Sequence, residues 1–431
     1  MSFIAFATRA KGPMAFLRRI GTIYKRYGLT TQKMEQSLDA FAQVLKQFDC
    51  GATFPITAVA LQRNPAVISK HLGGKIEFAV HGYTHIDYAE VAPDLLQEHL
   101  RRAGRIFAAA GVPMSGFRSP YLRRGENLYK AFEPAGFSYV SNQPIWWDVL
   151  EEADFDGHGQ VGYQRALAFY EPWRASERLS LPHLSNGLVE IPVSLPDDEI
   201  LLDRMSGEGS DLVEKVWRRI LDRAYQSGEL FVLQLHPERI APASEGLIAV
   251  LEHVRSFVPS VWMARLDEVA KWWRARLAAS VRLANVKDGV QITVTGPEEL
   301  TLLARGVESD VPVVPWKGAY RRILATSFTV RSALRPFVGL SPEIPPELAD
   351  FLKIQGYIVE FSREHHRYAC YFHRAEDLLA HPRALLAHIE DAGCPLVKVG
   401  RWPNGAACAF SITGDIDALT LWDYGLRVLG K

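Results

Sequence analysis

Two histidines four residues apart, His81 and His85, give the sharpest local signal in the chain, within the segment His-Gly-Tyr-Thr-His. Imidazole nitrogens at this spacing can converge on one divalent ion such as Zn²⁺. A pair of surface or capping histidines would give the same pattern. The apolar run at residues 76–80 is typical of a strand, and a strand would aim both rings at its end, which favours the metal site.

Two aspartates, Asp415 and Asp417, follow an apolar run at residues 406–412 near the end of the chain. Residues two apart on an extended segment point to the same side, so one carboxylate could bind a metal ion while the other acts as a base. The alternative is local, because Asp417 could cap a helix over residues 418–428.

Two further residues have the chemistry to assist. Arg118 precedes a proline-fixed turn and can hold a carboxylate in one orientation, although by itself it is more typical of a surface arginine beside a helix start. His236 follows the apolar run at residues 230–235 and can serve as a general acid near neutral pH. A satisfied core histidine is the more common explanation for one such residue.

The elements that must position these residues alternate between helices and short apolar strands over residues 1–278. This alternation predicts an α/β fold with a mostly parallel sheet or barrel, in which strand C-terminal ends carry the chemistry. Residues 279–400 change character. They open with a hairpin pattern and continue as short strands and helices, so we expect a smaller β-rich and then α+β module. Residues 401–431 form a third segment that carries the two aspartates.

Composition excludes some classes of function. The 431 residues contain 49 Lys and Arg against 49 Asp and Glu, a balance that gives no support for a nucleic-acid binder. The four cysteines form no C-x-x-C pair, and no run approaches the roughly 18 apolar residues of a membrane span. We therefore expect a cytoplasmic protein. Residues 14–26 have an amphipathic, basic pattern, for which we expect a docked surface helix, with peripheral membrane contact as the alternative.

Taken together, the motifs resemble the polysaccharide deacetylase family, also called the NodB-homology or carbohydrate esterase 4 group. The resemblance rests on Ala-Thr-Phe at residues 52–54, the histidine motif at 81–85, Arg-Ser-Pro-Tyr at 118–121 and Leu-His-Pro at 235–237. It implies an irregular (β/α)7-type barrel. The family normally opens with a strand ending in paired aspartates, and no acidic pair of that kind precedes residue 52.

The missing strand resembles residues 410–417, Phe-Ser-Ile-Thr-Gly-Asp-Ile-Asp, in the D-x-D form of the peptidoglycan-deacetylase and allantoinase-like branch. The simplest account is circular permutation, in which residues 401–431 supply the first strand of the barrel. Chain termini often lie close together in domains, which makes such a rearrangement tolerable. The rival accounts are insertion of the tail into a second subunit of a homodimer, and a leftover of a truncated domain.

The resemblance also implies roles for individual residues. It makes His81, His85 and Asp417 the ligands of a divalent metal, for which we expect Zn²⁺. It makes Asp415 the base and His236 the acid.

Three more positions complete the implied site. Arg118 would orient the base, and the backbone N–H of Tyr121 would stabilise the oxyanion. The family carries an aspartate and a tryptophan that tune the histidine acid. Trp146 and Trp147 lie in the corresponding part of this chain. We expect them to line the substrate, although a core role would explain them equally well.

We therefore expect a hydrolase that removes an N-acetyl group from a carbohydrate or glycolipid intermediate. Two alternatives stay open. One is a hydrolase of small cyclic amides with the same fold, and the other is a non-catalytic glycan-binding protein that keeps the fold without the chemistry.

Overall fold

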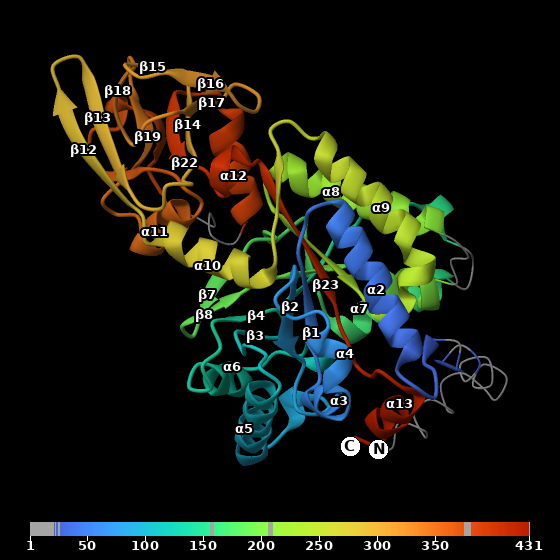
Figure 1. Ribbon diagram of the computed structural model, residues 1–431. Helices are drawn as coiled ribbons and strands as arrows, with labels where there is room; N and C mark the ends of the chain where they lie inside the picture. Colours follow the sequence, from blue (N-terminus) through green and yellow to red (C-terminus); the bar gives the residue numbers. More distant parts are fainter. Residues whose placement is uncertain are drawn as a thin grey trace.

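A computed structural model describes residue 21, residues 23 and 24, and residues 26–155, 159–205, 210–374 and 381–430. Most of residues 14–26, the segment expected to form a docked surface helix with membrane contact as the alternative, lies outside the described residues. In the part of the chain that is described, no helix has the length and apolar character required to cross a bilayer. The structure is a mixed α/β protein with an added β-rich module, which confirms the predicted fold class at that level (Figure 1).

A mostly parallel sheet forms the centre of the larger part of the molecule (Figure 1). Its main path runs in the order β10, β23, β1, β2, β3, β4, β8 and β7, and β11 also pairs with β23. These strands are Leu230–Leu235, Cys408–Gly414, Ala52–Ile56, Ile76–Val80, Gly116–Phe117, Tyr139–Val140, Leu188–Glu190, His183–Ser185 and Val261–Met263. The path ends at β10 and β7, so the closed barrel that the family resemblance implies stays a prediction.

The central strands β1, β10 and β23 are buried along their whole length. Apolar residues on both strand faces favour this placement, because helices cover parallel sheets. Helices α2 (Gln32–Gln47), α8 (Ser210–Ser227) and α9 (Ile240–Ser256) share one apolar core with these strands. The rings of Phe41 and Phe54, for example, meet edge to face with centroids 4.9 Å apart.

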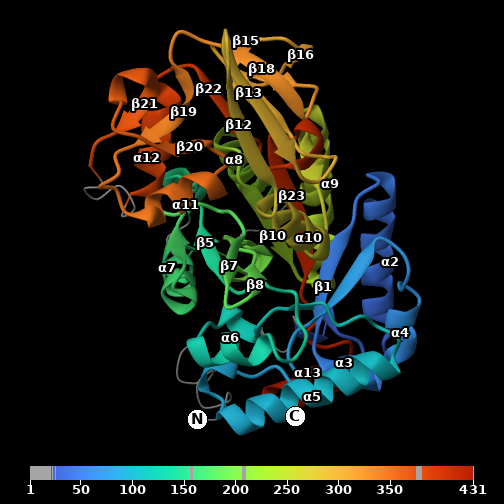
Figure 2. The ribbon, with the colours of Figure 1, turned by 90° about the vertical axis from the view of Figure 1, so that its left-hand side faces the viewer.

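The remaining elements of this larger part surround the sheet (Figure 2). The helices are α3 (Ala58–Arg63), α4 (Pro65–Ser69), α5 (Pro93–Ala109), α6 (Glu126–Phe132), α7 (Gly159–Tyr170) and α10 (Leu266–Leu277). A short parallel sheet contains β6 (Trp173–Arg174), β5 (Pro144–Trp146) and β9 (Val193–Leu195).

The C-terminal segment pairs inside the sheet of its own chain. Strand β23, drawn in red in Figure 1, lies between β10 and β1 and runs parallel to both. Helix α13 (Leu421–Val428) follows, and the side chain of Thr420 caps it by accepting a hydrogen bond from the backbone N–H of Asp423. The sequence-based alternative that Asp417 caps this helix is therefore wrong, because the helix begins later than the apolar pattern indicated.

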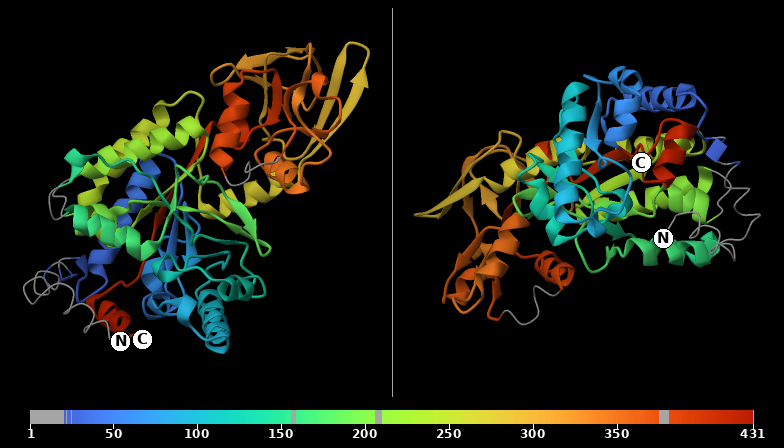
Figure 3. Two further views of the ribbon diagram at one scale, coloured as in Figure 1. Left: turned by 180° about the vertical axis from the view of Figure 1, so that it is seen from behind. Right: turned by 90° about the horizontal axis from the view of Figure 1, so that it is seen from below.

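Residues 280–399 form the accessory module, which projects from one end of the main sheet (Figure 3). Its strands are β12 (Ser280–Val286), β13 (Gly289–Thr295), β14 (Leu302–Arg305), β15 (Glu308–Ser309), β16 (Val313–Pro315), β17 (Arg321–Ile323), β18 (Ser327–Arg331), β19 (Arg335–Leu340), β20 (Val359–Phe361), β21 (Tyr368–Phe372) and β22 (Leu396–Val399). Its helices are α11 (Pro346–Ile354) and α12 (Pro382–Asp391). Residues 375–380 of this region lie outside the described residues.

The junction between the module and the larger part is built around residues 400–402, which lead from β22 of the module toward β23. Trp273 and Trp402 are both almost fully buried, with ring centroids 5.7 Å apart. Trp272 donates to the carbonyl of Arg401. Arg276 donates to the carbonyls of Gly400 and Ile354, which ties α10 to the module. These contacts form a tightly packed junction, called the seam below, between the module and the sheet that carries the two aspartates.

Candidate metal centre

Four predicted motifs meet at one edge of the main sheet because the strand register aligns their ends. Ile56 pairs with Val80, and Val80 pairs with Phe117, so His81 and Arg118 leave neighbouring strands together. On the other side of β1, Leu235 pairs with Gly414, which places His236 beside Asp415. The carboxyl ends of parallel strands are where α/β folds build their sites.

The turn between the two histidines requires its glycine. Gly82 has φ +84°, and a Cβ there would lie 2.4 Å from the ring of Tyr88. The Tyr88 hydroxyl accepts hydrogen bonds from the backbone N–H groups of Tyr83 and Thr84. This close packing turns the chain so that His81 and His85 face the same space, with ring centroids 5.2 Å apart.

The tail brings the third side chain to the histidines. Asp417 Oδ1 lies 3.3 Å from Nε2 of His81 and 3.3 Å from Nε2 of His85, and all three residues are buried. Nδ1 of His81 is 2.8 Å from the carbonyl oxygen of Arg118, so it must donate its proton there. In the neutral ring, Nε2 then presents its lone pair toward the carboxylate, which is the tautomer that a metal ligand needs.

The donor set fits a divalent cation. Burial and the nearby Arg427 guanidinium lower the pKa of His85 to about 4, so this imidazole is neutral near neutral pH. Burial alone would raise the pKa of Asp417, but Arg427 and the imidazoles hold it well below its usual range. Asp417 Oδ1 and His85 Nδ1 are buried without a hydrogen-bond partner among the described residues. Two nitrogens and one carboxylate oxygen suit Zn²⁺ and leave a position for water or substrate.

Arg427 on α13 contacts two of the three candidate ligands. Its Nη2 lies 2.7 Å from Asp417 Oδ2 and 3.2 Å from His85 Nε2. Helix α13 is held in place by Asp423, which pairs with Arg63 at 3.2 Å and accepts from Asn64 at 2.9 Å. Arg427 could not be placed here from the sequence, because its position depends on how the tail helix docks.

Asp415 is fixed by hydrogen bonds on both oxygens. Arg118 is fully buried and donates to Asp415 Oδ1 at 2.9 Å, and it also bonds Thr413 and Ser141. Gln234 donates to Asp415 Oδ2 at 2.9 Å. Gln234 is the side chain in β10 two residues before His236, and its polar character inside an apolar strand is the signal that sequence reasoning could have used.

His236 has a carboxylate partner that the sequence analysis missed. Asp198 Oδ1 lies 2.7 Å from His236 Nδ1, and Asp198 Oδ2 accepts from the backbone N–H of His236 at 2.8 Å. Burial would lower the pKa of His236, but Asp198 outweighs it and raises the pKa to about 10. The neighbouring Asp197 has its pKa raised to about 7 by burial and by the charge of Asp198. Two adjacent aspartates after a proline were the available signal.

The other predicted site residues lie in different settings. Tyr121 has φ +60°, a conformation that bulky residues rarely adopt outside functional turns, and its ring meets His85 edge to face at 4.6 Å. Trp147 is 2% exposed and donates to Ser194, so the expectation that it lines the substrate is corrected to a core position. Trp146 is partly exposed and donates to the Tyr163 hydroxyl.

Residues 25–140 match the family model described as polysaccharide deacetylase. Over these residues the match confirms the resemblance drawn from the motifs, to a family of hydrolases that act on C–N (amide) bonds. None of the curated proteins matches the chain.

Among solved structures, the chain is similar to a protein from Mycobacterium smegmatis proposed to be a polysaccharide deacetylase. That likeness has 22% identity, covers 63% of this chain and 87% of that one, and has a TM-score of 0.45. PuuE allantoinase is similar at 22% identity, covering 56% and 72%, with a TM-score of 0.42. A carbohydrate esterase 4 pseudoenzyme from Bacillus anthracis is similar at 14% identity, covering 55% and 61%, with a TM-score of 0.33.

Proposed function

We propose that this chain, whose residues 25–140 form a polysaccharide deacetylase segment, is a metal-dependent hydrolase that removes an N-acetyl group from a carbohydrate or glycolipid intermediate. One observation carries the proposal. Nε2 of His81, Nε2 of His85 and Oδ1 of Asp417 lie within 4.8 Å of one another, and all three residues are buried. Lone pairs facing each other at this distance repel unless a cation lies between them.

His81, His85 and Asp417 would hold the ion, with Zn²⁺ the expected one. When bound, such an ion supplies Lewis acidity toward an amide carbonyl and lowers the pKa of water. The protein contributes the orientation of the ligands: the carbonyl of Arg118 fixes the His81 tautomer, and Arg427 holds the second oxygen of Asp417.

Asp415 is the proposed base. Because Arg118 and Gln234 each bond one of its oxygens, the carboxylate keeps one orientation and is ready to accept a proton from water. The backbone N–H of Tyr121, a residue with φ +60°, is the proposed donor to the oxyanion, as the family resemblance implies.

His236 is the proposed acid that protonates the leaving amine. The Asp198 carboxylate fixes its ring and raises its pKa to about 10, so His236 carries the required proton near neutral pH. A charged acid paired with a fixed carboxylate base beside the same strand edge suits amide hydrolysis, which needs one proton removed and one delivered.

Two wider inferences accompany this function. The position of β23 between β10 and β1 supports the account of a circularly permuted barrel, in which the tail supplies the opening strand. A cytoplasmic address, inferred from the sequence, would place the reaction in the assembly of a surface polysaccharide.

The direct test is release of acetate from N,N′-diacetylchitobiose by the purified chain. We expect acetate and free amine in equal amounts, loss of both after treatment with a chelator, and recovery on adding Zn²⁺. The Asp415→Asn variant should release acetate about 10³-fold more slowly. The matched control is Asp148→Asn, an exposed aspartate outside the centre, which should keep full activity. Ring opening of a cyclic ureide without any acetate release, or an unreduced rate in Asp415→Asn, would contradict the proposal.

A further inference from the structure

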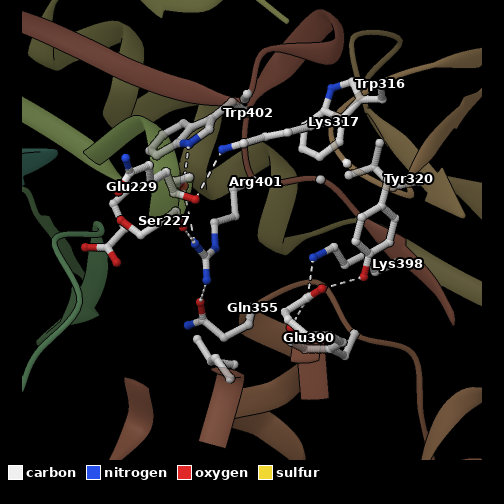
Figure 4. Close-up of a pocket in the computed structure, with 18 of the residues that line it drawn as sticks. Ser227, Glu229, Trp316, Lys317, Tyr320, Gln355, Glu390, Lys398, Arg401 and Trp402 are labelled. Atoms are coloured by element: carbon white, nitrogen blue, oxygen red, sulfur yellow. Dashed lines mark hydrogen bonds and ion pairs between the residues drawn. The ribbon is translucent and has the colours of Figure 1, made fainter. Parts of the chain in front are cut away.

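A cavity of about 680 Å³ lies at the seam between the main sheet and the accessory module (Figure 4). One wall is the turn at residues 226–229 together with Arg401 and Trp402, which precede β23. The opposite wall is the loop at residues 316–320 with parts of α12 and β22. None of the candidate metal ligands lines it. The volume is in the range of sites that hold small molecules, about 300 to 1,000 Å³, and such sites often occur between domains.

The lining has a surplus of positive charge. Five cationic side chains face two carboxylates, namely Arg305, Lys317, Arg383, Lys398 and Arg401 against Glu229 and Glu390. The carboxylates are already engaged within the module and its seam, since Glu390 pairs with Arg305 and Lys398, and Glu229 pairs with Arg383.

Two of these cations have only neutral partners. Lys317 donates to the carbonyls of Tyr225 and Gln226. Arg401 donates to the carbonyls of Ser227 and Gly228 and to the side-chain oxygen of Gln355. Among the described residues, no carboxylate lies within ion-pair distance of either cation. Partly buried cations without a counter-ion favour an anionic ligand, because desolvated charge is costly unless it is paired.

A third cation lies behind Arg401. Arg276 is 4% exposed, and burial together with the charge of Arg401 lowers its pKa to about 9. It donates to the carbonyls of Gly400 and Ile354 and lies over the Trp273 ring, and among the described residues its buried Nη2 has no hydrogen-bond partner. The positive charges of Lys317, Arg401 and Arg276 are therefore not balanced by a paired carboxylate among the described residues.

Lys317 and Arg401 contact the same turn, at Gln226 and Ser227, so their charges converge on one end of the cavity (Figure 4). The rest of the cavity offers flat rings and neutral polar groups. The Trp316 and Tyr320 rings meet edge to face at 6.2 Å, and Gln355 lies across from them. Aromatic faces beside amide and carbonyl groups are what a sugar ring needs, since it has both C–H faces and hydroxyl edges. An inorganic anion alone would leave most of this volume to water.

We propose that the seam cavity binds a phosphorylated sugar, with the phosphate at Lys317 and Arg401 and the sugar ring toward Trp316 and Gln355. Arg401 and Trp402 lead directly into β23, the strand that ends at the two aspartates. A ligand held there would also stabilise the docked tail, because any molecule that binds only the folded state raises its stability.

The test is calorimetric titration of the whole chain with glucose 1-phosphate, a probe that has no acetyl group, and in parallel with glucose and with inorganic phosphate. We expect glucose 1-phosphate to bind at least tenfold more tightly than either part. Lys317→Gln keeps an amide donor for the carbonyls but removes the charge, and should weaken binding about tenfold, as for a charged hydrogen bond. Ala387→Glu, an exposed lining position on α12, should weaken it as well.

Two controls locate the ligand. Lys287→Gln, at the exposed turn of the β12–β13 hairpin, should bind like the unaltered chain. Asp417→Ala should also keep full binding, because it alters only the metal centre. Absence of binding at millimolar probe, equal binding of glucose or of inorganic phosphate, or loss of binding in Asp417→Ala with retention in Lys317→Gln would each overturn the proposal.

Discussion

The metal centre contains a buried carboxylate and the accessory module a partly buried one, and their surroundings differ. In the module, Glu390 accepts hydrogen bonds from donors on both oxygens. Oε1 receives Lys398 at 2.6 Å and Tyr357 at 2.5 Å, and Oε2 receives Tyr320 at 2.8 Å and Arg305 at 3.1 Å. Although burial opposes ionisation, these partners lower the pKa of Glu390 to about 2.

At the metal centre, donors satisfy only one oxygen of the carboxylate. Asp417 Oδ2 pairs with Arg427, whereas Oδ1 faces two imidazole nitrogens at 3.3 Å. A carboxylate whose two oxygens both accept hydrogen bonds stabilises the fold and needs no bound cation. A carboxylate oxygen that faces other acceptors needs a cation, and this difference separates a folding cluster from a site.

The largest expected effect concerns Asp415, the first aspartate of the tail. Its side chain is held by Arg118 and Gln234, and among the described residues no hydrogen bond or ion pair joins it to the two histidines. Asp415→Asn should lower the rate of acetate release by about 10³-fold, the range for loss of a general base, and leave metal content unchanged. Activity assays and metal analysis on the same preparation check this. Parallel loss of metal would show that the two aspartates share one role and would break the distinction between ligand and base.

A smaller loss is expected when Asp198 no longer supports His236. Asp198→Asn should slow acetate release about 10²-fold, and should move the basic limb of the pH profile to lower pH because the pKa of His236 falls from about 10. The raised pKa also stabilises the fold below about pH 6.5, and this contribution is lost as pH rises through about 10. A pH profile identical to that of the unaltered chain would contradict the assignment of His236 as the acid.

The smallest effect tests the structural side of the comparison. Glu390→Gln leaves Lys398 without its charge partner and should reduce the free energy of unfolding by about 2 kcal/mol, measured by denaturant titration. The lowered pKa of Glu390 means that its contribution is present above about pH 4 and is lost as pH falls through about 2. Metal content should not change. If it did, the module would be part of the centre rather than a separate folding cluster.

Much of the fold could be predicted from the sequence because long apolar runs and helical periodicity are local signals. The strands Ile76–Val80 and Leu230–Leu235 coincide with the apolar runs that predicted them, and residues 280–295 form the hairpin expected at the start of the module.

The site was less accessible to sequence reasoning where it depends on contacts between distant segments. The histidine and D-x-D motifs are short local patterns, so their residues could be named in advance. Gln234, Asp198 and Arg427 act through partners far away in the chain. Trp147 was assigned to the substrate site because the sequence alone does not show whether an aromatic residue faces a cleft or, as here, the core.

The central claim is that the tail supplies a metal ligand to two histidines from the other end of the sequence. It is tested most directly by the metal content of Asp417→Ala after purification and dialysis, measured by elemental analysis beside the unaltered chain and the exposed control Asp148→Asn. The account predicts one equivalent of Zn²⁺ in the unaltered chain and the control, and at least a 100-fold loss of affinity in Asp417→Ala, beyond the 10–100-fold expected for an indirect partner. Full metal occupancy in a folded Asp417→Ala protein would contradict it.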